Sequence, residues 1–373
     1  MKEIQTIVAA YREHLRQDSG VVALATVVSV KGSVYRRPGA RMLISTHGHS
    51  LGAISGGCLE GDVVERACQV MTSGQSQLVV YDTTSDGDTV WGLGMGCNGE
   101  VQVLIEPVSL TADPHPITML ETLLSQSLPL VWATVVKTTD LNSVSVGSHL
   151  LLHSDGVVHS SIPNQALAKS LVADAGQVLR HQKSEFKAYV VEGVTTQVFL
   201  EFLEPPQPLA IFGAGYDALP LVALASELGW QVSVIDHRPA FARAERFPLA
   251  NQVIQSHPET ISDHVKLTSR TVAVVMTHNY QRDGEVLKAL LPFPLPYIGM
   301  LGPKRRTDAL LNDLQEAGVE ITPGQRQRIF GPAGLDIGAE TPEEIALSII
   351  AEIRAVISGH QAGFLRQRLG PIH

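Results

Sequence analysis

Apolar and polar positions follow recognisable patterns through the first half of the chain. The opening stretch, MKEIQTIVAAYREHLRQ, places its apolar residues at helical spacing and predicts an N-terminal helix. The run VVALATVVSV is rich in β-branched residues and predicts a buried strand over residues 21–30. The pattern then predicts strands at 41–46, 50–55, 77–81 and 99–106, and a helix over about 58–71. We therefore expect a mixed α+β arrangement in this half.

Beyond the middle of the chain the pattern changes to a regular alternation of strands and helices. Strands are predicted at 209–212, 231–235, 271–276 and 296–298, and helices at 218–228, 285–291 and 307–317. A last helix begins at ETPEEIALSIIAEI, where Thr341 is placed to be the N-cap, Pro342 takes the first helical position and Glu344 completes a capping box. Such alternation is typical of a parallel sheet flanked by helices.

An internal repeat links two parts of the first half. The stretch VALATVVSVKGSV…GARMLISTHG (22–48) is echoed by LVWATVVKTTDLNSV…GSHLLLHSDG (130–156). Ala-Thr-Val-Val, Ser-Val, Gly, Leu and Gly recur at a nearly constant offset, but the second copy has no Gly-Gly-Cys and no Arg-Arg-Pro. We interpret this as a duplicated β-unit in which only the first copy carries chemistry.

The proline-rich segment LEPPQPL, residues 203–209, is the best candidate for a domain boundary. We expect an N-terminal domain over residues 1–204, with a first β-unit at 20–108 and a second at 128–204, and a C-terminal domain over residues 205–373. The predicted fold class is therefore α/β: an N-terminal α+β domain with a duplicated β-unit, followed by a Rossmann-like domain with a parallel sheet.

Composition and charge narrow the classes of function. The 373 residues carry a formal net charge of −9, which argues against nucleic acid or an anionic membrane as the main partner. We find no secretory signal and no apolar run approaching about 20 residues, so we expect no membrane span. Three cysteines (Cys58, Cys68 and Cys97) can make neither a disulfide framework nor a four-cysteine zinc site. We expect a cytoplasmic protein without a bound metal ion of its own.

The stretch IFGAGYDALPL carries a glycine turn directly after a predicted strand. Gly213, Gly215 and Ala218 have the spacing of a dinucleotide-binding turn, and Asp236 ends the next strand about 20 residues later. The first glycine permits the tight turn, and the second lets a pyrophosphate approach the backbone at the helix N-terminus. Asp236 would then accept a hydrogen bond from a ribose hydroxyl. The alternative is that the turn serves packing alone and holds no nucleotide.

Three further loops should meet at the carboxyl ends of the same parallel strands, where open α/β sheets bind ligands. They are DHRP (236–239), THNYQRD (277–283) and GMLGPKRR (299–306). Their convergence on a glycine turn favours a nucleotide-like anionic ligand over the alternative that each basic residue only caps a helix or decorates the surface. His278 could hydrogen-bond that ligand or transfer a proton. The other residues that we expect to contact it are Gly302, Lys304, Arg305 and Arg306.

The first half offers a thiol on a glycine hinge, in the stretch AISGGCLEGDV. Cys58 should sit at or near a helix N-terminus, where the helix dipole lowers the pKa of a thiol. Gly56 and Gly57 remove side chains around it and let a large ligand or a partner approach. Cys97 is flanked by glycines in GLGMGCNG, and the strands could bring both thiols to one rim. The alternative is that both are inert packing residues, and Cys68 is predicted to be a core filler.

A second basic stretch, YRRPGARM, lies between two predicted strands. Arg36, Arg37 and Arg41 crowd a proline-glycine turn, which suits recognition of a phosphate or a carboxylate. A solvated loop explains the same spacing nearly as well. The acidic residues Asp82, Asp86 and Asp88 are predicted to decorate an exposed loop.

Taken together, these motifs resemble the XdhC/CoxI family, from about residue 20 to about residue 357 and in the same order. The stretches that carry the resemblance are GSVYRRPGARMLIS, GAISGGCLEGDV, WGLGMGCNGEVQVLIEP, IFGAGYDALPL, VIDHRPAFA, YIGMLGPKRR and GLDIGAETPEEIALSIIAEI. One departure is Tyr216, where many members have a histidine after Gly-Ala-Gly. Another is the repeat at 130–156, which makes this chain longer than the short members.

The resemblance implies an accessory protein for xanthine dehydrogenase and related molybdenum hydroxylases. Members bind molybdenum cofactor, as molybdopterin or its cytosine dinucleotide, help a cysteine desulfurase-type donor install the terminal sulfur, and deliver the cofactor to the apo-enzyme. Carried over by position, Cys58 and Cys97 are candidate contacts to the cofactor or its sulfur. Gly213, Gly215 and Asp236 become the candidate nucleotide turn.

Two classes of function follow from these observations. A cofactor chaperone explains the thiol hinge, the separate phosphate-binding domain and the lack of an evident acid–base constellation. An NAD(P)-dependent oxidoreductase explains the Rossmann turn and Asp236, but it offers only His278 as a proton relay and leaves the glycine-flanked cysteines unexplained. We favour the chaperone, a maturation factor rather than a turnover enzyme. An exposed site spanning two domains also favours a homodimer.

Overall fold

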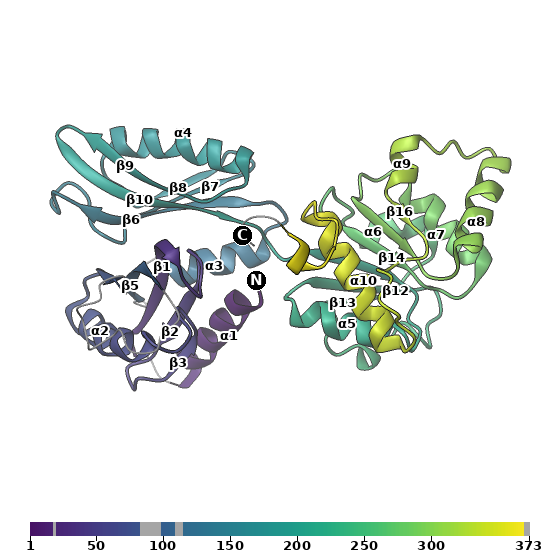
Figure 1. Ribbon diagram of the computed structural model, residues 1–373, viewed down its shortest axis with the longest axis horizontal. Coiled ribbons are helices and arrows are strands. Elements are labelled where there is room, and N and C mark those ends of the chain that lie inside the picture. Colours follow the sequence, from purple (N-terminus) through teal and green to yellow (C-terminus); the bar gives the residue numbers. More distant parts are fainter. Residues whose placement is uncertain (18–19, 83–97, 109–114, 369–373) are drawn as a thin grey trace. The chain divides into compact units, whose positions relative to one another are not determined.

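The chain divides into two compact units. The computed structural model describes residues 1–17, 20–82, 98–108 and 115–368. By its internal contacts the chain separates into Glu3–Pro205 and Pro206–His373, at a point between two adjacent prolines. Figure 1 shows the first unit in purple to teal and the second in teal-green to yellow.

The first unit consists of two antiparallel sheets and four helices within its described residues. Its elements are α1 (Lys2–Gln17), β1 (Val22–Ser33), β2 (Arg41–Ile44), β3 (Ser50–Gly52), α2 (Glu60–Ser73), β4 (Gln77–Asp82), β5 (Asn98–Val108), α3 (Pro116–Ser125), β6 (Leu130–Thr138), β7 (His149–His153), β8 (Val158–Ser160), α4 (Gln165–His181), β9 (Glu185–Val191) and β10 (Val194–Leu203). The strand orders are β3-β2-β1-β5-β4 and β8-β7-β6-β10-β9. The two sheets therefore have the same topology, as a duplicated β-unit requires.

Each sheet has one face covered by its own helix and one face turned to the other sheet. Alternate residues of β1 point to opposite sides, as strand geometry requires. Ala23, Ala25 and Val27 share a core with α2. Leu24 joins a core with Trp132 of the second sheet. In Figure 1, α4 lies along the outer face of the sheet formed by β6–β10. Another inner core contains Val28, Leu104, Val136 and Phe199.

The two sheets are also joined by buried polar pairs that mirror one another. Thr26 pairs with Arg41 in the first sheet, and Thr134 pairs with His149 at the equivalent position of the second. Arg41 donates from Nη1 to Oε1 of Glu201 in β10 at 3.1 Å and from Nη2 to its other oxygen. Glu106 of β5, the counterpart of Glu201, lies 3.0 Å from Nε2 of His149. Each β-unit thus supplies one glutamate to the other.

The second unit is a six-stranded parallel sheet between helices. Its elements are β11 (Pro208–Phe212), α5 (Ala218–Glu227), β12 (Gln231–Asp236), η1 (Ala244–Arg246), β13 (Gln252–Gln255), η2 (Pro258–Thr260), α6 (Ile261–His264), β14 (Val272–Val275), α7 (Tyr280–Leu290), β15 (Tyr297–Met300), α8 (Lys304–Glu316), α9 (Pro323–Gln327), β16 (Ile329–Phe330), α10 (Pro342–Ile357) and η3 (Leu365–Gln367). The strands lie in the order β13-β12-β11-β14-β15-β16. From β11 the chain adds β12 and β13 on one side and then returns to add β14, β15 and β16 on the other, as in a doubly wound dinucleotide-binding fold, and the position between β11 and β14 is its switch point. The predicted fold class is therefore confirmed.

The two faces of this sheet carry separate cores. Residues of α5 and α10 pack on one face, with Leu221 and Ile349 among them. Residues of α6, α7 and α8 pack on the other, with Leu287 and Leu310 among them. Thr341 accepts from the backbone N–H of Glu344 and closes the predicted capping box at the start of α10. The switch point is thus held between two buried layers.

Some element boundaries differ from those predicted. Helix α2 begins at Glu60 instead of residue 58, because Gly57 adopts φ +106°, outside the helical region, and the first helical hydrogen bond runs from the N–H of Val63 to the carbonyl of Leu59. Helix α7 begins at Tyr280 instead of residue 285, because Asn279 caps it through the N–H of Arg282. Cys68 is exposed, so the prediction that it fills the core is wrong. No helix of the described residues is long and apolar enough to cross a membrane.

Candidate functional site

Two connections leave the same end of the first sheet. Loop 34–40 runs from the end of β1 to the start of β2, and loop 53–59 leaves the end of β3. Met42 pairs with Gly52, so β3 ends beside the start of β2. Ser33 pairs with Asn98, where β5 begins. This end of the sheet, which we call the rim, therefore gathers the arginine-rich loop and the Gly-Gly-Cys loop. Cys97, Asp86 and Asp88 lie outside the described residues.

The Gly-Gly-Cys loop is organised around the hydroxyl of Ser55. This oxygen accepts from the backbone N–H groups of Gly57 at 3.1 Å and of Cys58 and Leu59 at 3.2 Å. The Cys58 thiol also lies in donating range of it, at 3.5 Å. One side chain therefore satisfies amides that a helix turn would leave without partners and at the same time fixes the thiol.

Glu60 closes the same loop from the first turn of α2. Its carboxylate accepts from the hydroxyl of Ser55 and from the N–H groups of Ser55 at 2.9 Å and Leu59 at 3.2 Å. Burial alone raises the pKa of Glu60, but these hydrogen bonds outweigh it and hold the pKa below its ordinary value. The loop is therefore locked by an ionised carboxylate.

The glycines of this loop have different surroundings. Gly57 has φ +106°, a conformation that L side chains rarely adopt, and a Cβ there would meet nothing within 4 Å. A Cβ at Gly56 would lie 3.7 Å from the ring of Tyr35 in the neighbouring loop. Because Tyr35 is highly exposed, the rim presents an aromatic ring, a glycine backbone and a partly exposed thiol to solvent.

The three arginines predicted to bind an anion here are placed differently. Arg37 is exposed at the rim. Arg36 forms an ion pair with Glu3 of α1. Arg41 departs from the expectation because only 2% of its side chain is exposed and both oxygens of Glu201 hold it, which leaves it no access to an external anion. Of the three, Arg37 is the cation that this rim offers to a ligand.

The equivalent loop of the second β-unit has a different structure. Pro163 and Asn164 stand where the first copy has Ser55 and Gly56. Asn164 is the N-cap of α4 and accepts from the N–H of Leu167 at 2.9 Å. Helix α4 of the second β-unit thus begins three residues earlier in the repeat than α2 of the first β-unit. The first β-unit lacks this capped helical turn and has the thiol loop in its place.

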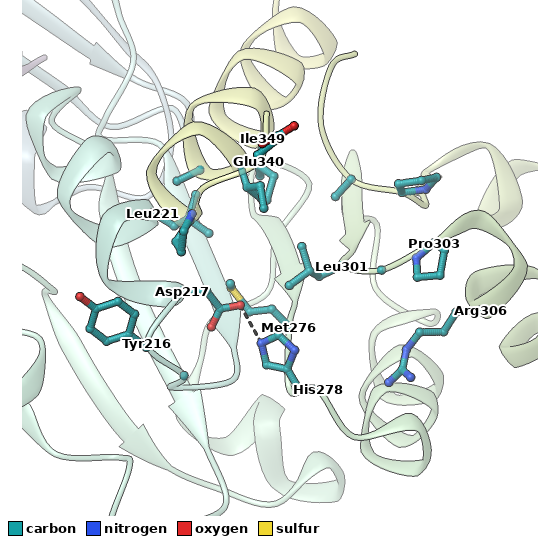
Figure 2. Close-up of a pocket in the computed structure, with 17 residues that line it drawn as sticks. Tyr216, Asp217, Leu221, Met276, His278, Leu301, Pro303, Arg306, Glu340 and Ile349 are labelled. Carbon is teal, nitrogen blue, oxygen red and sulfur yellow. Dashed lines mark hydrogen bonds and ion pairs between the residues drawn. The ribbon is translucent and has the colours of Figure 1, made fainter. Parts of the chain in front are cut away.

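The second unit contains a cleft of about 890 Å³ at the carboxyl ends of β11, β14 and β15. Gly215, Met276 and Leu301 follow these three strands and line it, and α10 contributes Ile345 and Ile349. Figure 2 shows Glu340 and Ile349 on one side of Leu301, with His278 and Arg306 on the other. The cleft thus has an apolar floor and a polar edge beside the glycine turn, and loops 277–283 and 299–306 contribute to its lining whereas loop 236–239 does not.

His278 is held in the cleft by an acid that the sequence did not point to. Its Nε2 lies 2.7 Å from Oδ2 of Asp217, which occupies the N-cap position of α5 but makes no capping hydrogen bond (Figure 2). The backbone of His278 has φ +58°, a strained conformation for a residue with a side chain. Such strain persists where the surrounding structure enforces it, so the fold itself holds this imidazole against Asp217.

The basic loop before α8 contributes one arginine to the cleft. Arg306 lines it and donates to Oδ2 of buried Asp283 at 2.6 Å. Lys304 is exposed and pairs with Asp308, and Arg305 is exposed as well. Helix α8 has no side-chain cap, and Gly302 before it adopts φ +117°. The loop therefore brings Arg306, Gly302 and the start of a helix to one side of the cleft.

Asp236 ends β12 as predicted, but it lies outside the lining of the cleft. Only 5% of it is exposed. Its oxygens accept from the N–H of Ala214 at 2.8 Å and from the backbone, Nε and Nη2 of Arg238 at 2.9, 3.0 and 2.7 Å. Burial raises the pKa of Asp236, and the hydrogen bonds from Arg238 and Ala214 lower it further than burial raises it. The acid is therefore engaged within its own loop.

No group of three or more potential metal ligands is found among the described residues. The rim offers a thiol, a guanidinium and backbone groups, and the cleft offers an imidazole, a guanidinium, carboxylates and backbone groups. The rim carries the residues that distinguish the first β-unit from the second. The cleft carries a histidine–aspartate pair and an anchored arginine at the switch point of a Rossmann fold.

Comparison with known proteins places the whole chain among relatives of one kind. Residues 209–353 match the XdhC Rossmann domain, and residues 15–82 match the XdhC and CoxI family. A protein of Bacillus subtilis, named as a probable component of xanthine dehydrogenase, is 34% identical over 91% of this chain and 94% of its own length. The molybdenum cofactor insertion chaperone PaoD of Escherichia coli is 22% identical over 94% of this chain and 88% of its own.

A solved structure agrees with this assignment. The crystal structure of a protein described as a xanthine dehydrogenase from Bacillus halodurans covers 98% of both chains, with 31% identity and a TM-score of 0.72. The similarity extends through both units. This chain belongs to the XdhC and CoxI family.

Proposed function

We propose that this protein is an accessory factor that binds molybdenum cofactor as cargo and passes it to a molybdenum hydroxylase of the xanthine dehydrogenase type. The observation that carries the proposal is the extent of the relationship to PaoD, a molybdenum cofactor insertion chaperone, which spans 94% of this chain. The relative named for xanthine dehydrogenase points to the class of recipient. The proposal specifies neither the form of the pterin nor the particular recipient enzyme.

The groups at the rim suit a bulky anionic cargo that has to be reached by other proteins. Gly57 leaves open space where any other residue would place a side chain. Cys58 is held by Ser55 yet remains partly exposed, and Arg37 offers a positive charge from the other loop of the rim. Molybdenum cofactor carries a phosphate and a metal coordinated by sulfur, so a thiol and an arginine on one rim are a suitable combination for holding it.

We assign a further step to Cys58, the support of cofactor sulfuration. The thiolate of Cys58 is a nucleophile that would attack the outer sulfur of a persulfide on the donor, forming a new S–S bond on Cys58 while the donor's cysteine thiolate leaves. The fixed position of Cys58 on Ser55 and its partial exposure suit contact with both the cargo and a cysteine desulfurase-type donor. On sequence grounds, Cys97 stays a candidate for the same role. We also propose a homodimer in which two chains share a site.

The proposal is tested by purifying the full chain from bacteria that make molybdenum cofactor and from bacteria that do not. Molybdenum content and the fluorescence of the oxidised pterin report retention, and transfer to an apo-molybdenum hydroxylase reports delivery. We expect both signals in the first preparation alone. Wild-type protein that retains no cofactor but transfers hydride with a nicotinamide would overturn the proposal and establish the oxidoreductase alternative.

Cys58→Ser tests the thiol, with Cys68→Ser as the matched control. Both cysteines belong to the same loop–helix segment, but Cys68 is exposed on the outer side of α2, away from the rim loop. We expect Cys58→Ser to lower the yield of active, sulfurated recipient by at least about tenfold and Cys68→Ser to leave it unchanged. Equal losses in both variants, or none in Cys58→Ser, would remove the thiol from the mechanism.

A further inference from the structure

The cleft of the second unit has features that the accessory function does not explain. It lies at the switch point of a dinucleotide-binding fold, yet it extends to only one side of that point. Its lining comes from the turns after β11, β14 and β15 and from α10, and it includes neither Asp236 nor His237 at the end of β12. A bound dinucleotide normally crosses the switch point, with the acid after the second strand on its ribose.

The side of the switch point next to β12 is closed by the chain itself. A carboxylate has about four acceptor positions. Asp236 receives four hydrogen bonds, three from Arg238 and one from the N–H of Ala214 inside the glycine turn. The guanidinium of Arg238 in addition lies 3.8 Å from the ring centre of Phe241. No acceptor remains for a ribose hydroxyl, and the amide of the turn is already used.

The open side presents groups that fit one phosphate. Gly302 and Pro303 line the cleft directly before α8, a helix of 13 residues whose N-terminus has no side-chain cap. Unpartnered amides at a helix N-terminus attract anions. Arg306 reaches the same region, and its contact with Asp283 engages Nη2 and fixes the guanidinium in place. His278, held by Asp217, adds a hydrogen-bonding group.

The remainder of the cleft fits a flat heterocycle. Met276, Leu301 and Ile349 provide an apolar surface of the kind on which a ring packs. Glu340 lies on the other side of Leu301 from Arg306 in Figure 2, and its carboxylate can accept from the amino group or ring N–H of a nitrogen heterocycle. A cavity of about 890 Å³ is within the size range of small-ligand sites.

We propose that this cleft binds a phosphorylated nitrogen heterocycle, with one ring system and one phosphate, and that it does not bind a nicotinamide dinucleotide. The phosphate lies at the start of α8 beside Arg306 and His278, and the ring lies on the apolar floor toward Glu340. Two sources share this chemistry, a nucleoside monophosphate and a phosphorylated pterin. The inference depends on the cleft alone and does not require the proposed function.

Titration of the full chain by calorimetry tests the inference and separates the two sources. The probes are CMP, a 6-substituted pterin monophosphate, the dephosphorylated form of each, and NAD⁺. We expect saturable binding of at least one monophosphate, at least about tenfold weaker binding of its dephosphorylated form, and no saturable binding of NAD⁺. Binding of CMP alone identifies a nucleotide site, and binding of the pterin phosphate alone identifies a pterin site.

Variants locate the site. His278→Asn keeps a residue type that tolerates the left-handed backbone but removes the imidazole. Arg306→Leu removes the guanidinium and is paired with Asp283→Asn so that no buried charge is left alone. Each should weaken binding of the monophosphate by about tenfold or more. Arg354→Ala, on α10 but exposed and outside the lining, should leave binding unchanged.

Three outcomes would overturn the inference: no binding of either monophosphate, saturable binding of NAD⁺, or binding that neither His278→Asn nor the paired Arg306 variant weakens. These failures are distinct from failure of the proposed function. A chain that retains molybdenum cofactor but binds no monophosphate refutes the inference alone. A chain that binds CMP in its cleft but never retains molybdenum refutes the proposed function alone.

Discussion

The two β-units of the first domain share one scaffold and differ at one end. Their strand orders are identical, and Tyr81 and Tyr189 occupy equivalent positions on β4 and β9, each donating to an aspartate on its own helix. The buried positions of α2 and its preceding loop correspond one to one with those of α4. These are Leu59, Val63, Ala67 and Val70 in the first copy and Leu167, Leu171, Ala175 and Val178 in the second.

The differences between the copies are concentrated in connections. The first copy has Tyr35, Arg36 and Arg37 where the second has Ser143, Val144 and Ser145. It has the Ser55–Cys58 loop in place of a capped helical turn. The second copy joins β9 to β10 by the two residues Glu192 and Gly193, whereas residues 83–97 separate β4 from β5. A core retained in both copies with new loops on one of them is the pattern expected when function is added to a stable framework.

The largest predicted effect concerns the junction between the copies. Arg41→Ala should lower the free energy of unfolding by about 3–5 kcal/mol, because it leaves the buried carboxylate of Glu201 without its partner. Urea denaturation of the full chain measures this change. Arg36→Ala is the control, since its pair with Glu3 is partly exposed and should contribute about 1 kcal/mol or less. Equal effects of the two variants would mean that the buried pair of Arg41 and Glu201 does not hold the two β-units together.

The second prediction converts the loop of the first copy into that of the second. Replacing Ser55-Gly56-Gly57-Cys58 by Pro-Asn-Gln-Ala copies residues 163–166 into the equivalent positions. We expect a helix that starts three residues earlier and an N-cap gain of about 1 kcal/mol in unfolding free energy. Retention of molybdenum cofactor should fall at least about tenfold. Denaturation and molybdenum content of the same preparations measure both. A swapped chain that retains cofactor would show that the rim is not its site.

A third prediction tests whether the scaffold is equivalent where the loops are not. The hydroxyl of Tyr81 donates to Asp62, and that of Tyr189 donates to Asp174 at 2.7 Å. Tyr81→Phe and Tyr189→Phe should each lower the unfolding free energy by about 1 kcal/mol, since each removes one partly buried hydrogen bond. Thermal denaturation of the two variants compares them directly. Effects that differ by more than about 1 kcal/mol would argue against equivalent roles in the two copies.

Local patterns in the sequence predicted most of what is local in the structure. The alternation of strand and helix, the glycine turn with Asp236 at the end of the next strand, and the Thr341 capping box all depend on local sequence patterns, and all three are present. The repeat was visible because Ala-Thr-Val-Val and the following glycines keep their spacing. Cys68 was misplaced because it lies one helical turn from the apolar residues Val64 and Met71, whereas the buried positions of α2 are Val63, Ala67 and Val70.

Partners that are distant in the chain could not be predicted in the same way. Arg41 looked like an anion-binding residue because its partner, Glu201, belongs to the other β-unit. Asp217 had no local signal, since only the fold brings it to His278. Asp236 has the position expected of a ribose-binding acid, but the sequence does not reveal that Arg238 turns back onto it. Long-range pairing thus decides which candidate residues remain accessible to a ligand.

The smallest predicted effect is a pH response confined to the first copy. Hydrogen bonds from Ser55 outweigh the opposing effect of burial and depress the pKa of Glu60, so its contribution to loop stability is present above the ordinary glutamate pKa. It is lost as the pH falls through the depressed value. The equivalent residue of the second copy is Ala168, and the cap there is the uncharged Asn164. The two loops should therefore respond differently to acid.

Amide hydrogen exchange of both loops, followed from neutral pH into the acid range and corrected for the intrinsic rate, measures that difference. Protection of Gly57, Cys58 and Leu59 should fall before the protein unfolds, by about 1 kcal/mol or less because Glu60 is partly exposed. Protection at Leu167 should follow global stability alone. Glu60→Gln should remove the early loss, since the amide does not titrate in this range. A parallel decline in both loops would show that Glu60 does not lock the thiol loop, and Ser55 alone would then hold Cys58 in place.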